Sequence, residues 1–341
     1  MPRTHPSILV VPSSSRYRTA LLSWYDSHRR DLPWRGTRDP YRIWLSETML
    51  QQTRVAAVIE HYYEFLRRFP TVEKLARARE ASVLAAWSGL GYYRRARMMH
   101  AAAKQIVREG KFPEASEELR NLPGIGRYTA AAIASIAFNE SVAVVDGNVE
   151  RVLRRLSGKL LSLPECWTAA AELLDSTRPG DFNQAMMEFG AVVCTPRMPG
   201  CLTCPVVDLC ATRGELPSQS KPAPQRKKEI HFALRCRGRA VLLVRRAMNA
   251  SLMPGMWELP EMRVNGAGAA GKQTFSPSSA KRRKDKPLYK LRHAITVTDY
   301  SVTVWRGRRT KVDAKWIPVD RLKQMPLTGL ARKILRKAEM L

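Results

Sequence analysis

The stretch LPGIGRYTA, residues 122–130, decides the fold that this sequence predicts. Gly124 and Gly126 stand directly before a helical run, so a tight turn there can present backbone N–H groups to a phosphate oxygen at a helix N-terminus. Twenty residues after Gly126, the stretch VDGNVERV (residues 145–152) opens another helix on Asp146. A glycine turn alone would be an ordinary connection between helices, and Asp146 alone would be a simple N-cap. Together, at this spacing, they indicate a helix-hairpin-helix followed by a functional aspartate.

The sequence around this hairpin divides into a helical and a mixed part. Residues 1–217 have apolar side chains at helical spacing and Pro and Gly at intervals, which predicts an all-α domain of a dozen or so short helices. Residues 218–229 predict an extended linker, because Pro and Lys alternate there without apolar periodicity. Residues 230–341 predict an α+β domain, with a disordered insertion at 263–287. Its expected strands are IHFALRC, RAVLLVRR, AITVTDYSVTVW and AKWIPV, and its expected helix is LARKILRKAEM.

Charge is the most unusual feature of the composition. The chain of 341 residues has 58 Lys and Arg against 30 Asp and Glu, a net charge of +28. Residues 221–341 hold 29 of the basic and 8 of the acidic side chains, so they carry +21, and residues 1–220 carry +7. Such an excess disfavours a neutral metabolic enzyme. It favours a polyanionic partner, either nucleic acid or an anionic membrane surface.

No segment predicts membrane insertion or export. The longest apolar stretch, residues 130–138, is far shorter than the roughly 20 residues that a spanning helix needs. The N-terminal sequence MPRTHPSILVVPSSS has too short an apolar core for a secretory signal. We therefore expect a soluble monomer in a bacterial cytoplasm, associated with the nucleoid and with no membrane partner.

Four of the six cysteines are clustered in the pattern C-x6-C-x2-C-x5-C, at Cys194, Cys201, Cys204 and Cys210. An intracellular chain disfavours a disulfide framework, so we expect a metal site. Four thiolates suit either zinc or an iron-sulfur cluster. Zinc ribbons usually use two C-x2-C pairs, whereas this loop has one. Its unequal spacing resembles the [4Fe-4S] cluster loop of the endonuclease III superfamily.

Glu47 is the candidate general acid of the helical part. It lies in the apolar helical context of Trp44, Leu45, Met49 and Leu50. Such surroundings disfavour the ionised carboxylate and raise its pKa, so that it can hold a proton near neutral pH. An exposed Glu on an amphipathic helix is the alternative. Cleavage of a glycosidic bond needs one group to protonate the leaving group and another to stabilise an oxocarbenium-like centre, and Glu47 and Asp146 suit those roles.

The motifs along the helical part, in order, closely resemble the adenine DNA glycosylase (MutY) family of the helix-hairpin-helix endonuclease III superfamily. The resemblance runs from about Trp24 to Cys210. It rests on PWR, SETMLQQTRV, GLGYYRRAR, LPGIGRYTAAAIASIAF, VDGNVERVLRRL, FNQAMMEFGAVVC and the four-cysteine loop. Beyond the linker, MPGMWELP (residues 253–260) resembles a segment of that family's C-terminal Nudix-like domain, which recognises 8-oxoguanine. A Nudix hydrolase motif is not evident, so no pyrophosphatase activity is expected.

The resemblance implies a role for each catalytic candidate. Glu47 would protonate adenine, and Asp146 would stabilise the oxocarbenium-like transition state with Asn148 orienting it. Bifunctional relatives have a lysine at the position of Tyr128, whose amine attacks the sugar and leads to strand cleavage. A tyrosine cannot form a Schiff base, so a monofunctional glycosylase is implied.

The resemblance also implies a set of DNA-binding and base-binding residues. Gln52 and Tyr92 would enter the duplex where the base leaves it, although core packing is an alternative for Tyr92 and Trp34. His293, in LRHAIT (residues 291–296), is matched to the histidine of the family's Phe-Ser-His lesion-reading loop, but Leu291 and Arg292 replace the other two residues. A plain strand is the alternative there. The full set is Trp34, Arg35, Leu50, Gln52, Thr53, Leu90, Gly91, Tyr92, Gly124, Gly126, Gln184 and His293.

The function expected from the sequence is therefore hydrolysis of the N-glycosidic bond of adenine mispaired with 8-oxoguanine or guanine in duplex DNA, in base excision repair. The expected cofactor is a [4Fe-4S] cluster. Two alternatives stay open. One is an endonuclease III-like pyrimidine glycosylase and lyase, which Tyr128 disfavours. The other is a non-catalytic lesion-binding protein, which the two carboxylates disfavour.

Overall fold

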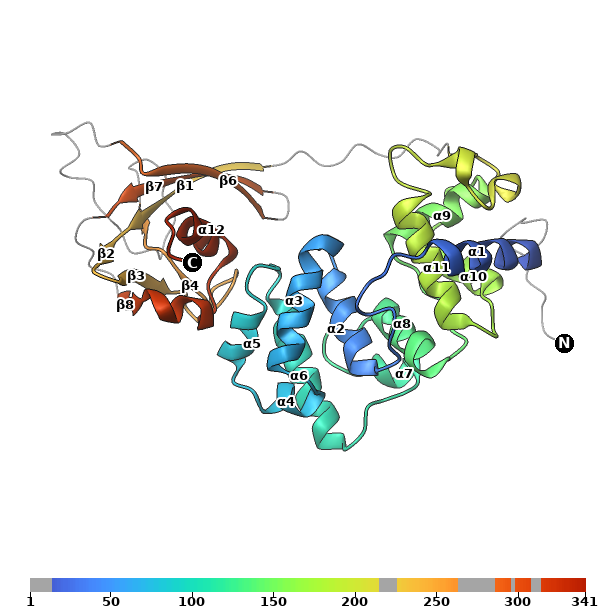
Figure 1. Ribbon diagram of the computed structural model, residues 1–341, viewed down its shortest axis with the longest axis horizontal. Coiled ribbons are helices and arrows are strands. Elements are labelled where there is room, and N and C mark those ends of the chain that lie inside the picture. Colours follow the sequence, from blue (N-terminus) through green and yellow to red (C-terminus); the bar gives the residue numbers. More distant parts are fainter. Residues whose placement is uncertain (1–13, 215–225, 263–285, 296–297, 308–313) are drawn as a thin grey trace. The chain divides into compact units, whose positions relative to one another are not determined.

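The computed structural model describes residues 14–214, 226–262, 286–295, 298–307 and 314–341, and the chain in it forms two compact units (Figure 1). The first unit comprises Met1–Arg77 and Met98–Ser220, and the second comprises Ala78–Arg97 and Lys221–Leu341. Within the described residues, no helix is both long and apolar enough to cross a membrane.

The first unit is helical. No β-strand occurs in it within residues 14–214. Its elements are α1 (Ser14–His28), α2 (Pro40–Leu50), α3 (Val55–Arg68), α4 (Val72–Arg77), most of α6 (Arg94–Glu109), α7 (Ser116–Leu119), α8 (Arg127–Phe138), α9 (Gly147–Ser157), α10 (Leu163–Leu173), α11 (Pro179–Val192) and the 3-10 turns η1 (Cys201–Thr203) and η2 (Val207–Leu209).

Local signals in the sequence fix where these helices begin and end. Asp39 caps α2, accepting from the backbone N–H groups of Tyr41 and Arg42, and proline follows it at the first helical position. Ser162 and Glu165 form a capping box at the start of α10. Asn139 ends α8 and Gly158 ends α9, both in left-handed conformations. The candidate site forms at the opposite ends of three of these helices, which are the C-terminal end of α2 and the N-terminal ends of α8 and α9.

One apolar core holds α1 and α8 to α11 together. Its fully buried side chains include Tyr17, Tyr25, Leu153, Phe182 and Phe189. The small residues of α8 allow close packing: a Cβ at Gly180, the second residue of α11, would lie 2.6 Å from the Ser135 carbonyl oxygen. The other side of α8 packs against α2. The helix that follows the hairpin is therefore in contact with helices on both sides.

The C-terminal part of the second unit forms, in its described residues, two sheets, the 3-10 helix η4 (Val319–Gln324) and a terminal helix. Strands β5 (Glu261–Met262), β1 (Arg226–Leu234), β7 (Thr298–Arg306) and β6 (Tyr289–Ile295) form the first sheet in that order, with β1 parallel to β7. The second sheet has β2 (Cys236–Arg237), β3 (Ala240–Arg245) and β4 (Trp257–Glu258), with β8 (Ala314–Pro318) also paired to β3. α12 (Gly329–Lys337) buries Leu330, Ile334 and Leu335 in the core of this unit.

A segment from the middle of the helical sequence belongs to the second unit. Ala78–Arg97 includes α5 (Glu80–Ala86) and the first residues of α6. Ser88 and Tyr93 both donate hydroxyl hydrogen bonds to the Leu327 carbonyl, at 3.0 and 2.9 Å. Arg332 donates to the Ser88 carbonyl at 2.9 Å. The sequence-based division at 218–229 did not anticipate this exchange, because no change of composition marks residues 78 or 97.

Two boundaries expected from the sequence were wrong. β1 already begins at Arg226, so the last four residues of the expected linker 218–229 are strand, and residues 218–225 lie outside the described part of the chain. The segment AITVTDYSVTVW, expected as one strand, belongs to two antiparallel strands, β6 and β7, in which Ile295 faces Thr298. No Gly, Pro or Asn marks the reversal, so the sequence gives no turn signal there. Most of the expected insertion, residues 263–285, lies outside the described residues.

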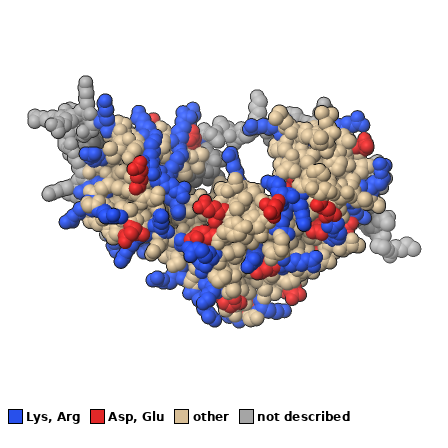
Figure 2. All heavy atoms as spheres, viewed as in Figure 1, with Lys and Arg blue, Asp and Glu red and all other residues tan. Residues whose placement is uncertain are grey.

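Basic side chains are dense on the second unit, as the blue atoms over its described strands show in Figure 2. Exposed Arg and Lys residues begin β1 and occur on β6 and α12: Arg226, Lys227, Lys228, Lys290, Arg292, Lys333, Arg336 and Lys337. The charge excess of residues 221–341 therefore includes a surface that would attract a polyanion.

The hairpin glycines predict a contrast in stability. Gly124 has φ +79°, and a Cβ there would lie 2.5 Å from Met98 Cβ, whereas a Cβ at Gly126 would meet no atom within 4 Å. We expect Gly124→Ala to lower the free energy of unfolding of the helical unit by about 2 to 4 kcal/mol. Gly126→Ala, the matched control, should change it by less than about 0.5 kcal/mol. Urea unfolding followed by circular dichroism at 222 nm measures both, and equal losses would contradict the strain at Gly124.

Candidate active site

Glu47 is held against Tyr128 at the contact between α2 and α8. The capped start of α2 places Glu47 on the buried side of the helix, where it is 5% exposed. The hairpin ends at Gly126, so Tyr128 lies in the first turn of α8. Its hydroxyl donates to Glu47 Oε2 at 2.6 Å. The two residues are 81 positions apart in the sequence and are joined by a short hydrogen bond.

Asp146 is both the N-cap of α9 and a member of the same site. Its Oδ1 accepts from the backbone N–H groups of Asn148 at 2.9 Å and Val149 at 2.8 Å, and its Oδ2 accepts from Asn148 Nδ2 at 3.0 Å. Arg151 in turn donates to Asn148 Oδ1 at 3.0 Å and to the Gly190 carbonyl at 2.7 Å. The aspartate is thus fixed by three donors, two from the helix N-terminus and one from an anchored amide.

These residues line one pocket of about 670 Å³. Of the residues expected from the sequence, the pocket collects Glu47, Tyr128, Asp146, Asn148, Trp34, Arg35, Leu50, Gln52, Thr53 and Gln184. The sequence did not single out Arg30, Leu32, Gln51, Val55, Val145, Gly147, Met187, Glu188 and Ala191, which also line it. Its volume lies within the range of small-molecule sites, so it can accept a nucleobase that has left the stack.

The two carboxyl groups differ in what surrounds them. Burial raises the pKa of Glu47 to about 7, with the charge of Asp146 adding to the rise and the Tyr128 bond and the charge of Arg35 opposing it. Burial also raises the pKa of Asp146, but three N–H hydrogen bonds oppose that rise. Glu47 therefore holds a proton near neutral pH, while Asp146 is surrounded by donors that favour its anion. A protonated acid beside a hydrogen-bonded carboxylate is the pair that glycosidic cleavage needs.

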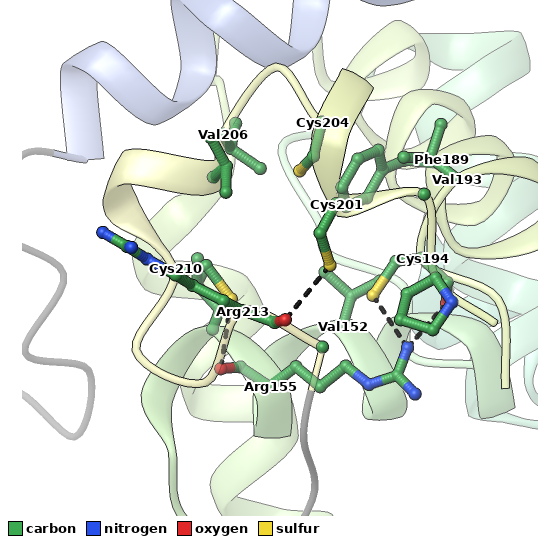
Figure 3. A pocket seen from close by; sticks show the side chains of 15 residues that line it. Val152, Arg155, Phe189, Val193, Cys194, Cys201, Cys204, Val206, Cys210 and Arg213 are labelled. Carbon is green, nitrogen blue, oxygen red and sulfur yellow. Dashed lines mark hydrogen bonds between the residues drawn. The ribbon is translucent and has the colours of Figure 1, made fainter. Parts of the chain in front are cut away.

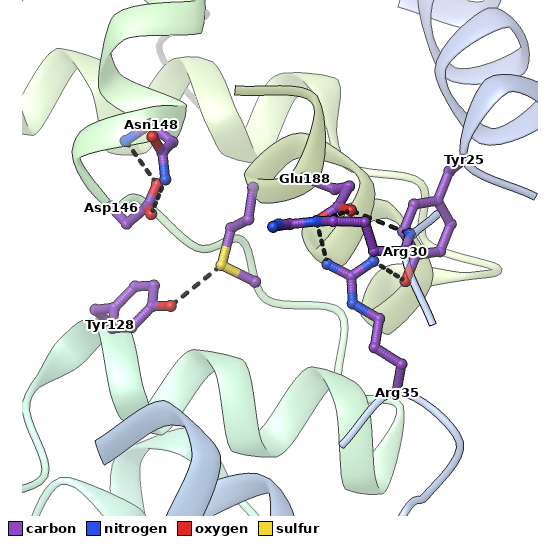
Figure 4. A network of polar contacts seen from close by, with 8 residues as sticks. Tyr25, Arg30, Arg35, Tyr128, Asp146, Asn148 and Glu188 are labelled. Atoms are coloured by element: carbon purple, nitrogen blue, oxygen red, sulfur yellow. Dashed lines mark hydrogen bonds and ion pairs between the residues drawn. The ribbon is translucent and has the colours of Figure 1, made fainter. Parts of the chain in front are cut away.

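Glu188 forms an ion-pair network at the edge of the pocket (Figure 4). This carboxylate is 1% exposed and accepts from Arg30 Nε at 2.7 Å, from Arg30 Nη2 at 2.7 Å and from Arg35 Nη2 at 2.6 Å. Arg35 also donates to Tyr25 Oη at 3.2 Å. Burial alone would raise the pKa of Glu188, but the two arginines outweigh it and hold this pKa below the usual value. The criterion that identified Glu47, an acid among apolar neighbours, would have found Glu188 in FNQAMMEFG.

Several residues expected from the sequence lie elsewhere. Gly124 and Gly126 form the hairpin before α8 and do not line the pocket. Leu90, Gly91 and Tyr92 belong to the Ala78–Arg97 segment of the second unit. His293 lies on β6 of the same unit. Burial, with the nearby charge of Lys333, lowers the pKa of His293 and so favours its neutral form. The structure therefore brings ten of the expected residues into one pocket and leaves these six outside it.

Two candidate DNA contacts share an uncommon backbone conformation. Gln52 has φ +56° and Tyr92 has φ +45°, both in the left-handed region that favours glycine. Gln52 is exposed directly after the end of α2, and Tyr92 is 45% exposed in its own unit, with Arg95 over its ring at 5.4 Å. Strained backbone at exposed positions is typical of functional loops, where the conformation presents a side chain outward.

The four clustered cysteines line a second pocket, between α9, the end of α11 and the turns η1 and η2 (Figure 3). Arg155, 3% exposed, donates to Cys194 Sγ at 3.3 Å and to the Thr195 carbonyl at 2.7 Å. Its Nε is buried and has no hydrogen-bond partner in the part of the chain that the structure describes. Burial and the neighbouring sulfurs raise the pKa of Cys204 to about 11. As the side chains are placed in the described residues, no three of His, Cys, Asp or Glu lie in an arrangement that would hold a metal ion.

The donor set in this second pocket suits a positively charged group. Four sulfurs share an apolar space, where thiolates would repel one another and pay for desolvation unless a cation joins them. Cys201 and Cys210 instead donate as thiols to the carbonyls of Arg213 and Arg155, at 3.2 and 3.4 Å. The guanidinium of Arg155 supplies a positive charge and a donor to the sulfur of Cys194.

The hairpin, the capped aspartate and the buried glutamate define a helix-hairpin-helix protein with an acid-and-carboxylate pocket. Residues 45–160 match the family model described as "HhH-GPD superfamily base excision DNA repair protein". A solved structure described as that of a thermostable thymine-DNA glycosylase has 30% sequence identity and a TM-score of 0.56, covering 59% of this chain and 96% of that chain. The chain belongs to the HhH-GPD superfamily of base excision DNA repair proteins.

Similar sequences confirm the expected resemblance to adenine DNA glycosylases. The adenine DNA glycosylase of Homo sapiens is 48% identical over 221 residues, which cover 60% of this chain and 40% of that protein. That of Arabidopsis thaliana is 40% identical over 306 residues, covering 74% of this chain and 48% of that protein. The chain thus aligns with less than half of the length of these relatives. The Arabidopsis alignment exceeds what residues 1–220 alone could supply, so the similarity continues into the second unit.

The raised pKa of Glu47 predicts a pH-dependent stability. Between about pH 4.5 and 7 the folded state keeps a proton that the unfolded state loses, so the wild-type protein loses stability as the pH rises through this window. Glu47→Gln does not titrate. We therefore expect it to be more stable than wild type by about 2 to 3 kcal/mol at pH 8 and equally stable at pH 4.

Urea unfolding at the two pH values checks this, with Glu165→Gln as the control. Hydrogen bonds from Ser162 lower the pKa of Glu165, so this variant should lose stability at pH 8 instead. Equal stability of wild type and Glu47→Gln at pH 8 would contradict a buried, proton-holding Glu47.

Proposed function

We propose that this protein is a monofunctional DNA glycosylase that removes adenine paired with 8-oxoguanine or guanine in duplex DNA. The observation that carries the proposal is the pocket that joins a proton-holding Glu47 to Asp146. Tyr128 occupies the position where a bifunctional enzyme would need an amine, and no lysine lines the pocket among its described residues. The adenine specificity is supported by the similarity to adenine DNA glycosylases in sequence.

The chemistry follows from how the two carboxyl groups are held. Glu47 donates its proton to the leaving base, because burial keeps that proton in place near neutral pH. Asp146 remains an anion within its three hydrogen bonds and stabilises the positive charge that develops on the sugar. Water then adds to the sugar and leaves an abasic site. Tyr128 positions Glu47 and takes no covalent part.

The rest of the pocket would recognise the extruded base. Gln184, 8% exposed, offers both a donor and an acceptor to the edge of a base. Trp34 offers an aromatic face. Its ring is fixed by an edge-to-face contact with Tyr62, with 5.4 Å between the two ring centroids. The Glu188 network holds Arg35 in place at the rim of the pocket. Extrusion of the base costs a few kcal/mol. A residue such as Gln52 would offset part of this cost by occupying the space that the base leaves.

The DNA backbone would meet the hairpin and the basic second unit. The N-terminus of α8 has no side-chain cap, so its backbone N–H groups can donate hydrogen bonds to a phosphate oxygen. The second unit would read the lesion as a Nudix-like domain, with His293 as the candidate reader. This assignment is supported by a mixed sheet with a packed helix, by MPGMWELP and by the extent of the Arabidopsis alignment. Non-specific affinity would come from its charge and weaken with salt.

The cysteine loop would hold a [4Fe-4S] cluster through Cys194, Cys201, Cys204 and Cys210. The proposal is supported by the shared pocket, by the Arg155 guanidinium and by the unequal spacing. When bound, the cluster supplies a structural cross-link between the end of α11 and the loop that follows it. Arg155 and Arg151 both donate to the Cys194 carbonyl, at 3.3 and 2.9 Å, which positions the first ligand against α9.

The excision test uses duplexes that carry adenine opposite 8-oxoguanine, guanine or thymine, each labelled on the adenine strand. We expect alkali-dependent strand cleavage with the first two duplexes and none with the third. Glu47→Gln should lower the single-turnover rate by at least about 100-fold, because the general acid is removed. Glu64→Gln, at a half-buried glutamate on α3 that does not line the pocket, is the control and should keep the wild-type rate.

The same assay separates the alternatives. Borohydride trapping of a covalent protein–DNA adduct, with cleavage that needs no alkali, would support a lyase instead. Lesion binding without any base release would support a non-catalytic protein.

The cluster proposal predicts a visible absorbance. Protein purified without oxygen should absorb near 400 nm and contain about four irons per chain. Cys204→Ser should lose most of both, whereas Cys236→Ser, an exposed cysteine of the second unit, should keep them. Colourless protein with one zinc per chain would overturn the assignment.

A further inference from the structure

The Tyr128 hydroxyl has two acceptors within reach but only one hydrogen. Its oxygen lies 2.6 Å from Glu47 Oε2 and 3.1 Å from the sulfur of Met187, the contact drawn as a dashed line from Tyr128 in Figure 4. Met187 is on α11, next to Glu188, and lines the same pocket. A phenol has one O–H donor and can also accept, so it can serve one of these partners as a donor at a time.

The hydroxyl takes a different role in one of the two protonated forms of Glu47, the form with its proton on Oε2. When Glu47 is ionised, the hydroxyl donates to its carboxylate. When Glu47 carries a proton on Oε2, that proton is donated to the tyrosine oxygen, and the tyrosine hydrogen must turn to another acceptor. The sulfur at 3.1 Å is that acceptor, since a thioether accepts a hydrogen bond weakly. Without it, this form of the acid would leave a hydroxyl hydrogen unpaired in a partly buried site. Only the form with its proton on Oε1, whose Oε2 still accepts from Tyr128, would then remain.

We propose that Met187 is a positioning residue that stabilises the acid form of Glu47 by accepting the hydroxyl hydrogen of Tyr128. The proposal rests on the proposed glycosylase function and deepens it. It assigns to Met187, which lines the pocket, the task of keeping Glu47 protonated. This exchange of hydrogen-bond roles among Glu47, Tyr128 and Met187, which we call the relay, changes no covalent bond. The carboxyl proton stays on Glu47 until the base takes it.

The remaining charged groups around Glu47 do not replace this acceptor. Asp146, from the start of α9, accepts from Asn148 and Val149, and Arg35, from the segment after α1, is a donor held by Glu188. Arg30 is paired with the same Glu188. None of these contacts involves the Tyr128 hydroxyl. Across the described residues, the Tyr128 hydroxyl is hydrogen-bonded to Glu47 and Met187 alone.

The neighbouring methionine provides a matched control. Met186 also accepts a tyrosine hydroxyl, that of Tyr17 at 3.1 Å, but this pair is buried in the core, with Tyr17 fully buried and Met186 2% exposed. Met186→Leu and Met187→Leu therefore remove the same kind of hydrogen bond from adjacent residues of α11. Only the second removes it from the pocket.

The test is the pH profile of single-turnover excision of adenine opposite 8-oxoguanine. Wild type should lose activity above about pH 7 as Glu47 ionises. Met187→Leu should move this loss to lower pH by about half to one pH unit, because the acid form with its proton on Oε2 loses the acceptor for the tyrosine hydrogen. Met187→Gln, whose amide oxygen accepts strongly, should restore the wild-type profile or exceed it, and Met186→Leu should leave the profile in place. A profile that Met187→Leu does not shift, whatever its rate, would overturn the proposal.

A second measurement works without any turnover. In full-length protein with carbon-13-labelled glutamate carboxyl groups, the Glu47 signal is identified by its loss in Glu47→Gln, and its titration midpoint should fall in Met187→Leu. In Tyr128→Phe, which has no hydroxyl, adding Met187→Leu should cause no further fall. If wild type excises nothing but the midpoint shifts as stated, the glycosylase function fails and the relay stands. If wild type excises adenine and the midpoint is unmoved, only the relay fails.

Discussion

The hydrogen bond between Tyr128 and Glu47 constrains much of the helical unit. A carboxyl group 5% exposed is tolerated only if it is neutral or well paired, and here a hydroxyl from α8 meets it at 2.6 Å. For this bond to form, the cap at Asp39 must set the start of α2, and the hairpin must end at Gly126 so that Tyr128 lies in the first turn of α8. The close packing of α11 against α8 then brings Gln184, Met187 and Glu188 to the same pocket.

Much of this arrangement could be predicted from local chemistry in the sequence. The hairpin glycines, the helix-start Asp146 and the apolar surroundings of Glu47 each carry their own physical signal, and ten expected residues meet in one pocket. Met187 and Arg30 have no such signal. A methionine at helical spacing is ordinary core, and an arginine between His28 and Leu32 is ordinary surface, until the fold places a tyrosine or a glutamate beside it.

The second unit was less predictable for a different reason. β6 and β7 pair across a reversal without turn residues, and β1 pairs in parallel with a strand more than sixty positions away, which no local pattern encodes. From the sequence alone, the Ala78–Arg97 segment is expected to belong to the helical first unit. Its partners Leu327 and Arg332 lie more than two hundred residues further along the chain, so no local pattern reveals them. Local propensity sets each element, and long-range pairing sets where it belongs.

The Ala78–Arg97 segment depends on the C-terminal part of the chain, because two of its hydroxyl groups donate to the Leu327 carbonyl. A fragment ending at Ser220 would retain Ser88 and Tyr93, 1% and 3% exposed in the full chain, but would lack the oxygen to which both hydroxyls donate. The apolar side chains around them would be opened to water at the same time. The loop that presents Tyr92 would then lose its fixed geometry. The family motif GLGYYRRAR lies in the first third of the sequence, yet its Tyr93 and Arg97 donate to the carbonyls of Leu327 and Pro254, far along the chain.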